Sequence, residues 1–336
     1  MDEFITLSCG SGGKLTHRLI SDVFYKYFGN NLLLEAGDSA VFQVSQGKMA
    51  FTTDSYVVSP IFFKGGNIGK LAICGTVNDL AVSGACPKYI SCGFIIEEGF
   101  SIRELRLIAE SMAETAKEAG VSIVTGDTKV VQKGSADKIF INTSGIGFIR
   151  DGVNLSSKGI KNGDKIILSG TMGDHGTAIL LERENFKVQS SIKSDCAPLN
   201  SLIGPVLNAF PENVRIMRDP TRGGVATALN ELICGSGLSI QLFEDSLPVH
   251  DEVKGICEML GMDPLYMANE GKVLLIVDGF HADGILELLK ENPYGKDAAI
   301  IGTVTDAFAD KVFISTLAGG NRIVDMLVSD QLPRIC

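Results

Sequence analysis

Short apolar runs alternate with amphipathic stretches along this chain, and that alternation limits the folds open to it. Residues 89–96 form an apolar run of strand length, and residues 101–119 follow with apolar side chains at helical spacing. Residues 165–169, 272–277 and 298–304 are further strand-like runs, with helix-like segments such as 280–291 between them. Both periods recur through the chain, so the sequence predicts a mixed α/β (α+β) fold.

The length of the chain and one polar segment predict its division into domains. At 336 residues the chain is long enough for two domains with separate cores. Arg150-Asp151-Gly152 begins a polar linker after the strand-like residues 139–149. We therefore expect domains at 1–150 and 151–325, followed by a mobile tail at 326–336.

Charge and hydropathy exclude two classes of partner. The formal net charge of −10 argues against a nucleic-acid surface, which would be basic. No stretch approaches the ~20 apolar residues of a membrane span, and the N-terminus lacks a basic and then apolar signal. The eight cysteines include no C-x-x-C pair, which favours reduced thiols. We expect a cytoplasmic protein that binds neither nucleic acid nor a membrane.

The last residue is a cysteine, in the sequence Leu332-Pro333-Arg334-Ile335-Cys336. Chain termini fray unless they are tied down, and a thiolate is a strong nucleophile. Arg334 places a cation beside the thiol, and Pro333 stiffens the approach to it. Cys336 is either an incidental residue on a loose end or the reactive group that the rest of the chain serves.

Four aspartates in the first half share a context: Asp38, Asp54, Asp79 and Asp127 each lie beside Ser, Thr, Asn or Gly near the end of an apolar run. One such aspartate is usually a turn residue that bonds its own backbone. Four of them suit Mg²⁺, which prefers hard oxygen ligands and bridges to phosphates. The sequence therefore predicts a Mg²⁺-ATP site at these carboxylates.

Other residues suit the phosphates and the proton transfers of such a site. Gly10-Ser11-Gly12-Gly13 precedes an amphipathic helix-like stretch at 14–28, an arrangement that presents backbone N–H groups to an anion. Candidate phosphate cations are Lys70, Lys129 and Arg222. Glu270 lies between Asn269 and Gly271 and is a candidate base, and His175, expected in a loop, is the second. Neither a P-loop nor a dinucleotide-binding fingerprint is present.

Together these motifs resemble a known family. The matching segments are Gly10–Gly13, Thr53–Tyr56, Cys74–Asp79, Thr125–Lys129, Gly173–Gly176, Asp219–Gly224, Asn269–Lys272 and Pro333–Cys336. They are similar to the HypE family of hydrogenase maturation proteins, within the PurM-like, ATP-binding superfamily of aminoimidazole ribonucleotide synthetase. The aspartate motifs point to the superfamily, whereas the terminal Pro-Arg-Ile-Cys singles out the HypE family.

The resemblance implies a two-domain PurM-like fold, in which the N-terminal sheets of a homodimer pair into a barrel and the C-terminal domain is an α/β sandwich. It implies nucleotide-binding residues Gly10, Ser11, Gly12, Gly13, Lys70, Asn78, Asp219 and Arg222. It also implies a carbamoyltransferase partner, HypF, and a HypC–HypD complex that accepts cyanide.

The implied reaction is ATP-dependent dehydration of an S-carbamoyl group on Cys336 to a thiocyanate, which supplies cyanide for the iron of [NiFe]-hydrogenase. Asp38, Asp54, Asp79 and Asp127 would hold Mg²⁺-ATP. Lys129 would neutralise developing charge, and Glu270 or His175 would take protons. A kinase or synthetase of the same superfamily acting on a free small molecule is the alternative, and a non-catalytic scaffold is the third reading.

Overall fold

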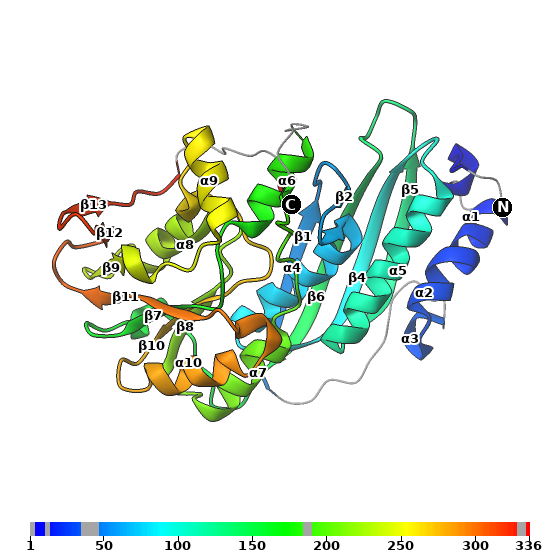
Figure 1. Ribbon diagram of the computed structural model, residues 1–336. Coiled ribbons are helices and arrows are strands. Elements are labelled where there is room, and N and C mark those ends of the chain that lie inside the picture. The colour runs from blue at the N-terminus through cyan, green and yellow to red at the C-terminus, as the bar shows by residue number, and fades with distance from the viewer. Residues whose placement is uncertain (1–3, 11–13, 35–46, 184–189, 328–333) are drawn as a thin grey trace.

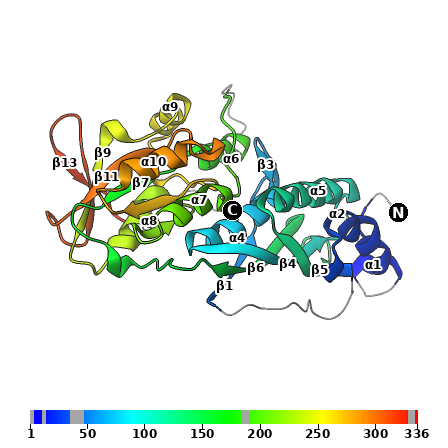
Figure 2. The same ribbon diagram turned by 90° about the horizontal axis from the view of Figure 1, so that it is seen from below.

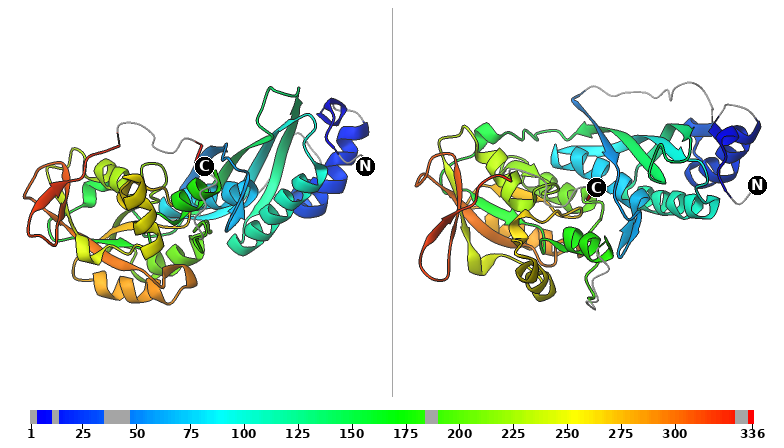
Figure 3. Two further views of the ribbon diagram at one scale, coloured as in Figure 1. Left: turned by 45° about the horizontal axis from the view of Figure 1, so that its top comes forward. Right: turned by 90° about the horizontal axis from the view of Figure 1, so that it is seen from above.

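The computed structural model describes residues 4–10, 14–34, 47–183, 190–327 and 334–336, and the described chain forms two halves. Each half contains a β-sheet with helices packed against it (Figure 1). The N-terminus lies at the outer end of the first half. In every view the C-terminus lies instead where the two halves meet (Figures 1, 2 and 3).

The first half is built on a four-stranded sheet with the strand order β1-β6-β4-β5. Its strands are β1 (Met49–Tyr56), β4 (Ala85–Glu97), β5 (Ser122–Val131) and β6 (Ile139–Ile149). The β4–β5 pair is parallel, and the other pairs are antiparallel. A two-stranded ribbon of β2 (Phe62–Phe63) and β3 (Gly66–Asn67) precedes the first long helix.

Two long helices pack on this sheet, α4 (Ile68–Val82) and α5 (Ile102–Ala119). The α5 helix begins at Ser101, whose hydroxyl accepts a hydrogen bond from the Glu104 N–H, and ends at Gly120 in the left-handed conformation. The α4 helix is buried on nearly all sides because the second half covers the face that the sheet leaves open.

The N-terminal segment adds a chain of short helices beside α5 and β5. They are a 3₁₀ turn (Leu7–Gly10), α1 (Lys14–Leu19), a π-helical segment (Ile20–Tyr25), α2 (Lys26–Phe28) and α3 (Asn31–Leu34). Phe24 stacks on Phe94 of β4 with ring centroids 4.7 Å apart, which fixes this segment against the sheet.

The second half contains a seven-stranded sheet with the order β13-β12-β9-β11-β7-β10-β8. Its strands are β7 (Lys165–Leu168), β8 (Val214–Arg218), β9 (Ser239–Phe243), β10 (Leu274–Val277), β11 (Ala299–Thr305), β12 (Lys311–Ser315) and β13 (Asn321–Ile323). Strand β10, which lies between β7 and β8, is buried at every position, since helices cover both faces of the sheet.

The helices of this half are α6 (Asp174–Arg183), α7 (Asn200–Ala209), α8 (Gly224–Ile233), α9 (Asp251–Leu260) and α10 (Ala282–Lys290). Short 3₁₀ turns lie at Ser157–Gly159, Glu244–Ser246, Pro264–Tyr266 and Pro293–Gly295. Side chains of α8 pack on one face of the sheet, and those of α7 and α10 pack on the other. Among the residues described, no helix combines the length and the apolar character needed to cross a membrane.

Most elements expected from the sequence are confirmed, including the helix at 101–119 and the strands at 89–96 and 298–304. One expectation is wrong in its boundary. Asp127 was expected near the end of an apolar run, but residues 126–129 lie inside β5, paired in parallel with β4 from Cys92 onward. This backbone pairing keeps a polar Gly-Asp-Thr-Lys segment extended, although its side chains look like those of a loop.

Candidate active site

A cavity of about 310 Å³ lies where the two halves and the C-terminus meet. The first half contributes side chains from β1 and α4 to its wall. The second contributes the end of β8, the turn between β8 and α8, the α8 helix, and Glu270 in the segment that leads to β10. Its lining is Thr53, Asp54, Gly75, Asp79, Arg218, Asp219, Thr221, Arg222, Thr227, Ala228, Glu231, Glu270 and Cys336.

Two of the four aspartates predicted as metal ligands, Asp54 on β1 and Asp79 on α4, line this cavity. Asp219, which the resemblance implied as a nucleotide-binding residue, lies after β8 and lines it too. Burial, then the neighbouring Asp79, raises the pKa of Asp219 from its ordinary 3.8 to about 7. Burial also raises the pKa of Asp79, although the Thr52 hydroxyl donates a 2.8 Å hydrogen bond to its carboxylate. The cavity thus gathers carboxyl groups whose negative charge the lining residues Arg218 and Arg222 offset only in part.

This donor set fits a divalent cation. Asp54, Asp79 and Asp219 offer hard carboxylate oxygens, which are the ligands that Mg²⁺ takes while keeping waters. In the described part of the chain, no three Asp, Glu, His or Cys side chains are grouped closely enough to enclose an ion by themselves. A cation here would therefore take part of its coordination from water or a phosphate.

Glu270 is buried, with 4% of its surface exposed, and it lines the same cavity as Cys336. Burial, then Cys196 and Asp219, raises the pKa of its carboxyl group well above the ordinary 4.5. Its Oε1 atom has no hydrogen-bond partner among the described residues. A buried carboxyl group with a raised pKa and a free oxygen is suited to accept a proton from a group in the cavity.

The end of the chain enters the cavity as an added backbone segment. The N–H of Val57 donates to a main-chain oxygen of Cys336 at 3.0 Å, and the N–H of Ser59 donates to the Arg334 carbonyl at 3.3 Å. Between them, Ile335 is 2% exposed and packs in the core of the first half. This pairing leaves the half-buried Cys336 facing the acidic cavity.

Arg334 adds contacts outside the cavity. Its guanidinium donates to the Val57 carbonyl at 2.8 Å and forms an ion pair of 2.7 Å with Asp137. Its backbone lies in the left-handed region at φ 55°, which an L-residue adopts only when other contacts hold it there. The docked tail is therefore held by its surroundings.

His175 does not lie in a loop, and that expectation was wrong: it occupies the first turn of α6 and is fully buried. Its Nδ1 lies 2.8 Å from the Ser194 hydroxyl, and its Nε2 lies 2.8 Å from the Ile335 carbonyl. His175 is absent from the cavity lining. It contacts the backbone of the tail, whereas Glu270 faces the space beside the thiol.

Asn78 uses its side chain within the protein. Its amide group donates to the carbonyls of Ala197 and Glu270, and its oxygen accepts a hydrogen bond from the Leu199 N–H. These contacts tie α4 to the segment that carries Glu270 and position that residue. Because these hydrogen bonds use both the amide nitrogen and the oxygen of Asn78, neither group is free here for the predicted role in nucleotide binding.

Asp127 and Lys129 lie on β5, at the edge of the sheet opposite β1. They are exposed and form an ion pair of 2.7 Å, and the hydrogen bond from Lys129 is the main cause of the lowered pKa of Asp127. Neither residue lines the cavity that contains Asp54 and Asp79. Among the described members of the predicted set, Asp127 therefore lies apart from Asp54 and Asp79.

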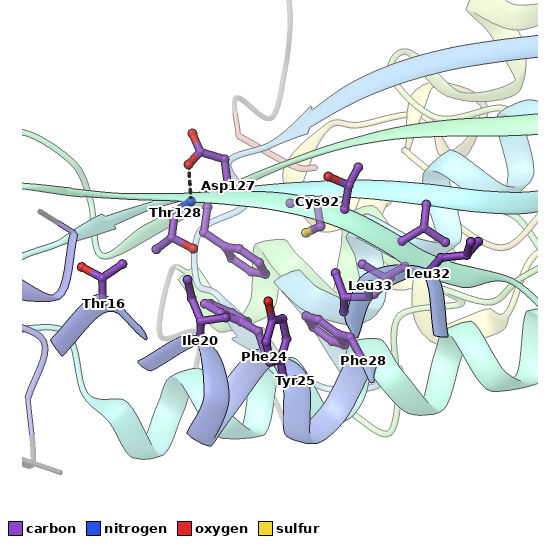
Figure 4. A pocket seen from close by; sticks show the side chains of 15 residues that line it. Thr16, Ile20, Phe24, Tyr25, Phe28, Leu32, Leu33, Cys92, Asp127 and Thr128 are labelled. Carbon is purple, nitrogen blue, oxygen red and sulfur yellow. Dashed lines mark hydrogen bonds between the residues drawn. The ribbon is translucent and has the colours of Figure 1, made fainter. Parts of the chain in front are cut away.

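A second, more apolar cavity of about 200 Å³ lies beside Asp127, between the N-terminal helices and strands β4 and β5. Phe24, Tyr25 and Phe28 form one wall of it (Figure 4). The Asp127 carboxylate points to the opposite side of its strand, where it accepts a hydrogen bond from the Thr128 N–H.

The remaining predicted residues are divided. Asp219 and Arg222 line the acidic cavity, whereas Lys70 lies in the first turn of α4 and donates to the Gly65 carbonyl at 3.2 Å. Gly10 ends the first 3₁₀ turn. Ser11, Gly12, Gly13 and Asp38 lie outside the described residues.

The sequence reading missed several residues that shape the site. Arg218 precedes Asp219 and lines the cavity, and its place in the Arg-Asp-Pro-Thr-Arg segment was a usable signal. Asp137, Arg183 and Ser194 contact the tail or the histidine that holds it. Their sequence contexts are ordinary, so nothing marked them in advance.

Comparison with known proteins agrees with this geometry. Residues 36–149 match the N-terminal domain and residues 161–315 the C-terminal domain of AIR synthase related proteins. The carbamoyl dehydratase HypE of Bradyrhizobium diazoefficiens is 50% identical over 335 residues, which cover 99% of this chain and 96% of the relative. The chain belongs to the HypE family. The family, the mixed α/β fold and the class of enzyme predicted from the sequence are thereby confirmed.

Solved structures of HypE proteins have the same fold. A HypE in complex with ATP is 46% identical, with a TM-score of 0.94, and the match covers 98% of this chain and 99% of that one. The HypE of a HypE–HypF complex is 50% identical, with a TM-score of 0.81 and coverage of 92% and 99%. The chain is therefore an enzyme, a carbamoyl dehydratase, and the free-metabolite kinase or synthetase is not favoured.

Proposed function

We propose that this HypE family enzyme dehydrates an S-carbamoyl group carried by its own Cys336 to a thiocyanate, with ATP as the second substrate. One observation carries the proposal: the docked tail brings Cys336 into the same cavity as Glu270, Asp54, Asp79 and Asp219. A tethered substrate needs no binding pocket of its own, because the chain delivers the reacting group to the site.

The chemistry explains why ATP is needed. The oxygen of a carbamoyl group is a poor leaving group, so it first attacks the γ-phosphorus and becomes a phosphate ester as ADP leaves. The C–O bond then breaks, phosphate departs and the nitrogen loses its two protons as the C≡N bond forms. The balance is one thiocarbamate and one ATP to one thiocyanate, ADP, phosphate and a proton, with no oxidation or reduction.

The residues of the cavity divide these tasks. Glu270 takes protons from the nitrogen, because it is the buried carboxyl group with a free oxygen beside Cys336. Arg218 and Arg222 lie on the same wall and would balance phosphate charge. Lys129, which the sequence proposed for that task, lies on β5 and outside this cavity.

Mg²⁺ fits the donor set of the cavity, and we propose that Asp54, Asp79 and Asp219 hold it. A bound divalent cation would compensate the negative charge that the triphosphate adds to these carboxylates. Asp219 replaces Asp127 in the predicted ligand set, since only Asp219 lies with the other two.

A homodimer is the assembly that the exposed sheet face favours. On that face β1 exposes Met49 at 53% and Phe51 at 66%, and β4 exposes Ile95 at 44%. The strand register places Phe51 opposite Ile146 of β6, and Ile95 opposite Phe140 of the same strand. An apolar face of this kind is typically covered by a partner, and we propose a second copy of the chain.

Two further partners follow from the family. A relative has been solved as a HypE–HypF complex, and we propose that HypF likewise carbamoylates Cys336 here. A HypC–HypD complex would then accept the cyanide for the iron of [NiFe]-hydrogenase. We place the reaction in the cytoplasm, where ATP is supplied.

Phosphate release tests the proposal. Carbamoylated enzyme supplied with ATP should release one phosphate per chain and then stop, because each chain carries a single substrate group. Cys336→Ala should release none. ATP turnover that persists in Cys336→Ala, with an added small molecule as acceptor, would instead establish the free-metabolite alternative.

A further inference from the structure

A main-chain oxygen of each of the last three residues accepts a hydrogen bond, and the donors come from both halves. From the first half, Val57 and Ser59 donate backbone N–H groups to Cys336 and Arg334. From the second half, His175 contacts the Ile335 carbonyl at 2.8 Å, and the Arg183 guanidinium donates to the Arg334 carbonyl. The backbone of the tail is thus hydrogen-bonded on one side to the segment that follows β1 and on the other side to helix α6.

Both donors of the second half stand on α6, His175 in its first turn and Arg183 at its last residue. Arg183 also donates to the Ser59 carbonyl, so the same guanidinium joins α6, the tail and the first half. The Gly-Asp-His-Gly motif at the start of α6 was recognised in the sequence, but the proposed chemistry assigns it no task.

The hydrogen bonds around His175 determine which nitrogen carries its proton. The Ile335 carbonyl can only accept, so Nε2 must donate. The Ser194 oxygen accepts from the Cys196 N–H at 3.1 Å, and its hydroxyl proton can be donated to Nδ1 at 2.8 Å, which suits the neutral ring. His175 is therefore a neutral donor of fixed orientation, in keeping with a pKa that burial lowers.

We infer that His175 and Arg183 form a tail clamp, which docks Cys336 for dehydration without taking part in the chemistry. The clamp grips carbonyl groups on the residues before Cys336, so it holds the tail whatever group the sulfur carries. His175 is thus a positioning residue and not the second base. The inference deepens the proposed function, and it rests on that function only for its dehydration readout.

Thiol accessibility tests the clamp without any of the proposed chemistry. The unmodified enzyme, without ATP, is treated with iodoacetamide, and alkylation of the C-terminal peptide is followed by mass spectrometry. His175→Leu removes the buried hydrogen bond to the Ile335 carbonyl, so the undocked tail should become more populated. We expect alkylation of Cys336 to become about tenfold faster in this variant. Arg183→Met should act in the same direction.

Two variants separate a clamp from a general structural role. His175→Gln places an amide donor near the position of Nε2, so its alkylation rate should return toward that of the wild type. His281→Leu is the matched control, because His281 contacts Asn213 and Asp278 away from the tail. In His175→Leu the ATP-dependent dehydration of carbamoylated enzyme should slow, while carbamoylation by the partner stays the same or becomes faster.

Equal alkylation of Cys336 in the wild type, Arg183→Met and a folded His175→Leu would overturn the clamp. Faster alkylation in the His281→Leu control to the same extent would also overturn it. If the clamp variants expose Cys336 but the wild type itself never dehydrates a carbamoyl group, the clamp stands and the proposed function fails.

Discussion

Asp219 offers a quantitative test of the acidic cavity. Its pKa of about 7 in the folded protein lies well above its ordinary 3.8, because burial and Asp79 disfavour the charged form. The folded state therefore binds a proton that the unfolded state has already released. Between about pH 3.8 and about pH 7 the free energy of unfolding falls as the pH rises, so this stabilisation is fully present only below about pH 3.8.

The magnitude follows from the shift. Each pKa unit corresponds to about 1.4 kcal/mol, so the two units between pH 5 and pH 7 give an upper figure of roughly 2.7 kcal/mol. Asp219→Asn removes this titration and keeps the shape of the side chain. Without divalent metal, raising the pH from 5 to 8 should therefore lower the free energy of unfolding of the wild type relative to that of the variant by about 2 kcal/mol.

Urea denaturation of the wild type and the variant in EDTA, at pH 5 and at pH 8, measures this change directly. Adding Mg²⁺ at pH 8 should then stabilise the wild type more than Asp219→Asn, because the cation relieves the repulsion that the amide lacks. Asp306→Asn, on the exposed surface of the second half, should show neither effect. Parallel pH profiles for wild type and Asp219→Asn would refute the reasoning about the cavity.

Three further changes test other parts of the account. Glu270→Gln should lower the rate of dehydration by about 10²–10⁴-fold and leave carbamoylation of Cys336 intact, as followed by intact-protein mass. Gly75→Ala should lower the free energy of unfolding by about 1–3 kcal/mol in urea, because a Cβ there would lie 2.2 Å from the Tyr56 hydroxyl. Phe51→Asp should shift the sedimentation of the protein to that of a single chain, because it places a charge on the proposed dimer face.

Matched controls keep these results interpretable. Glu231→Gln alters an exposed carboxylate of the same cavity and should retain most of the dehydration rate, so an equal loss would count against Glu270 as the base. Gly255→Ala, with open space around its Cβ, should leave stability unchanged or raise it. A dimer that survives Phe51→Asp would show that the partner binds elsewhere.

The sequence predicted the parts of the site whose local context carries the signal. The aspartates near the ends of apolar runs and Glu270 before a buried strand were found in this way. A change from apolar to polar residues is visible in the sequence itself, and it marks where a buried element begins or ends. Asp127 had the same context and was misplaced. The backbone pairing of β5 with β4 keeps the segment extended, and sequence context carries no sign of that pairing.

The tail contacts could not be found in this way. Arg183 is 151 positions from Arg334, and His175 is 160 positions from Ile335, so only the folded chain brings them together. His175 was expected in a loop because glycines flank it, yet the packing of α6 makes it a buried helical residue. Helix α7 was not predicted either, because it contains Pro205 and a proline inside a helix usually breaks it.

The central claim is that the terminal thiol carries the substrate, and the mass of the intact protein tests it most directly. The enzyme is incubated with its carbamoylating partner, carbamoyl phosphate and ATP, and is then measured with ATP retained or removed. The account predicts a carbamoyl adduct on Cys336 that loses one water only when ATP remains available. An adduct on another residue, or one on Cys336 that never loses water, would contradict it.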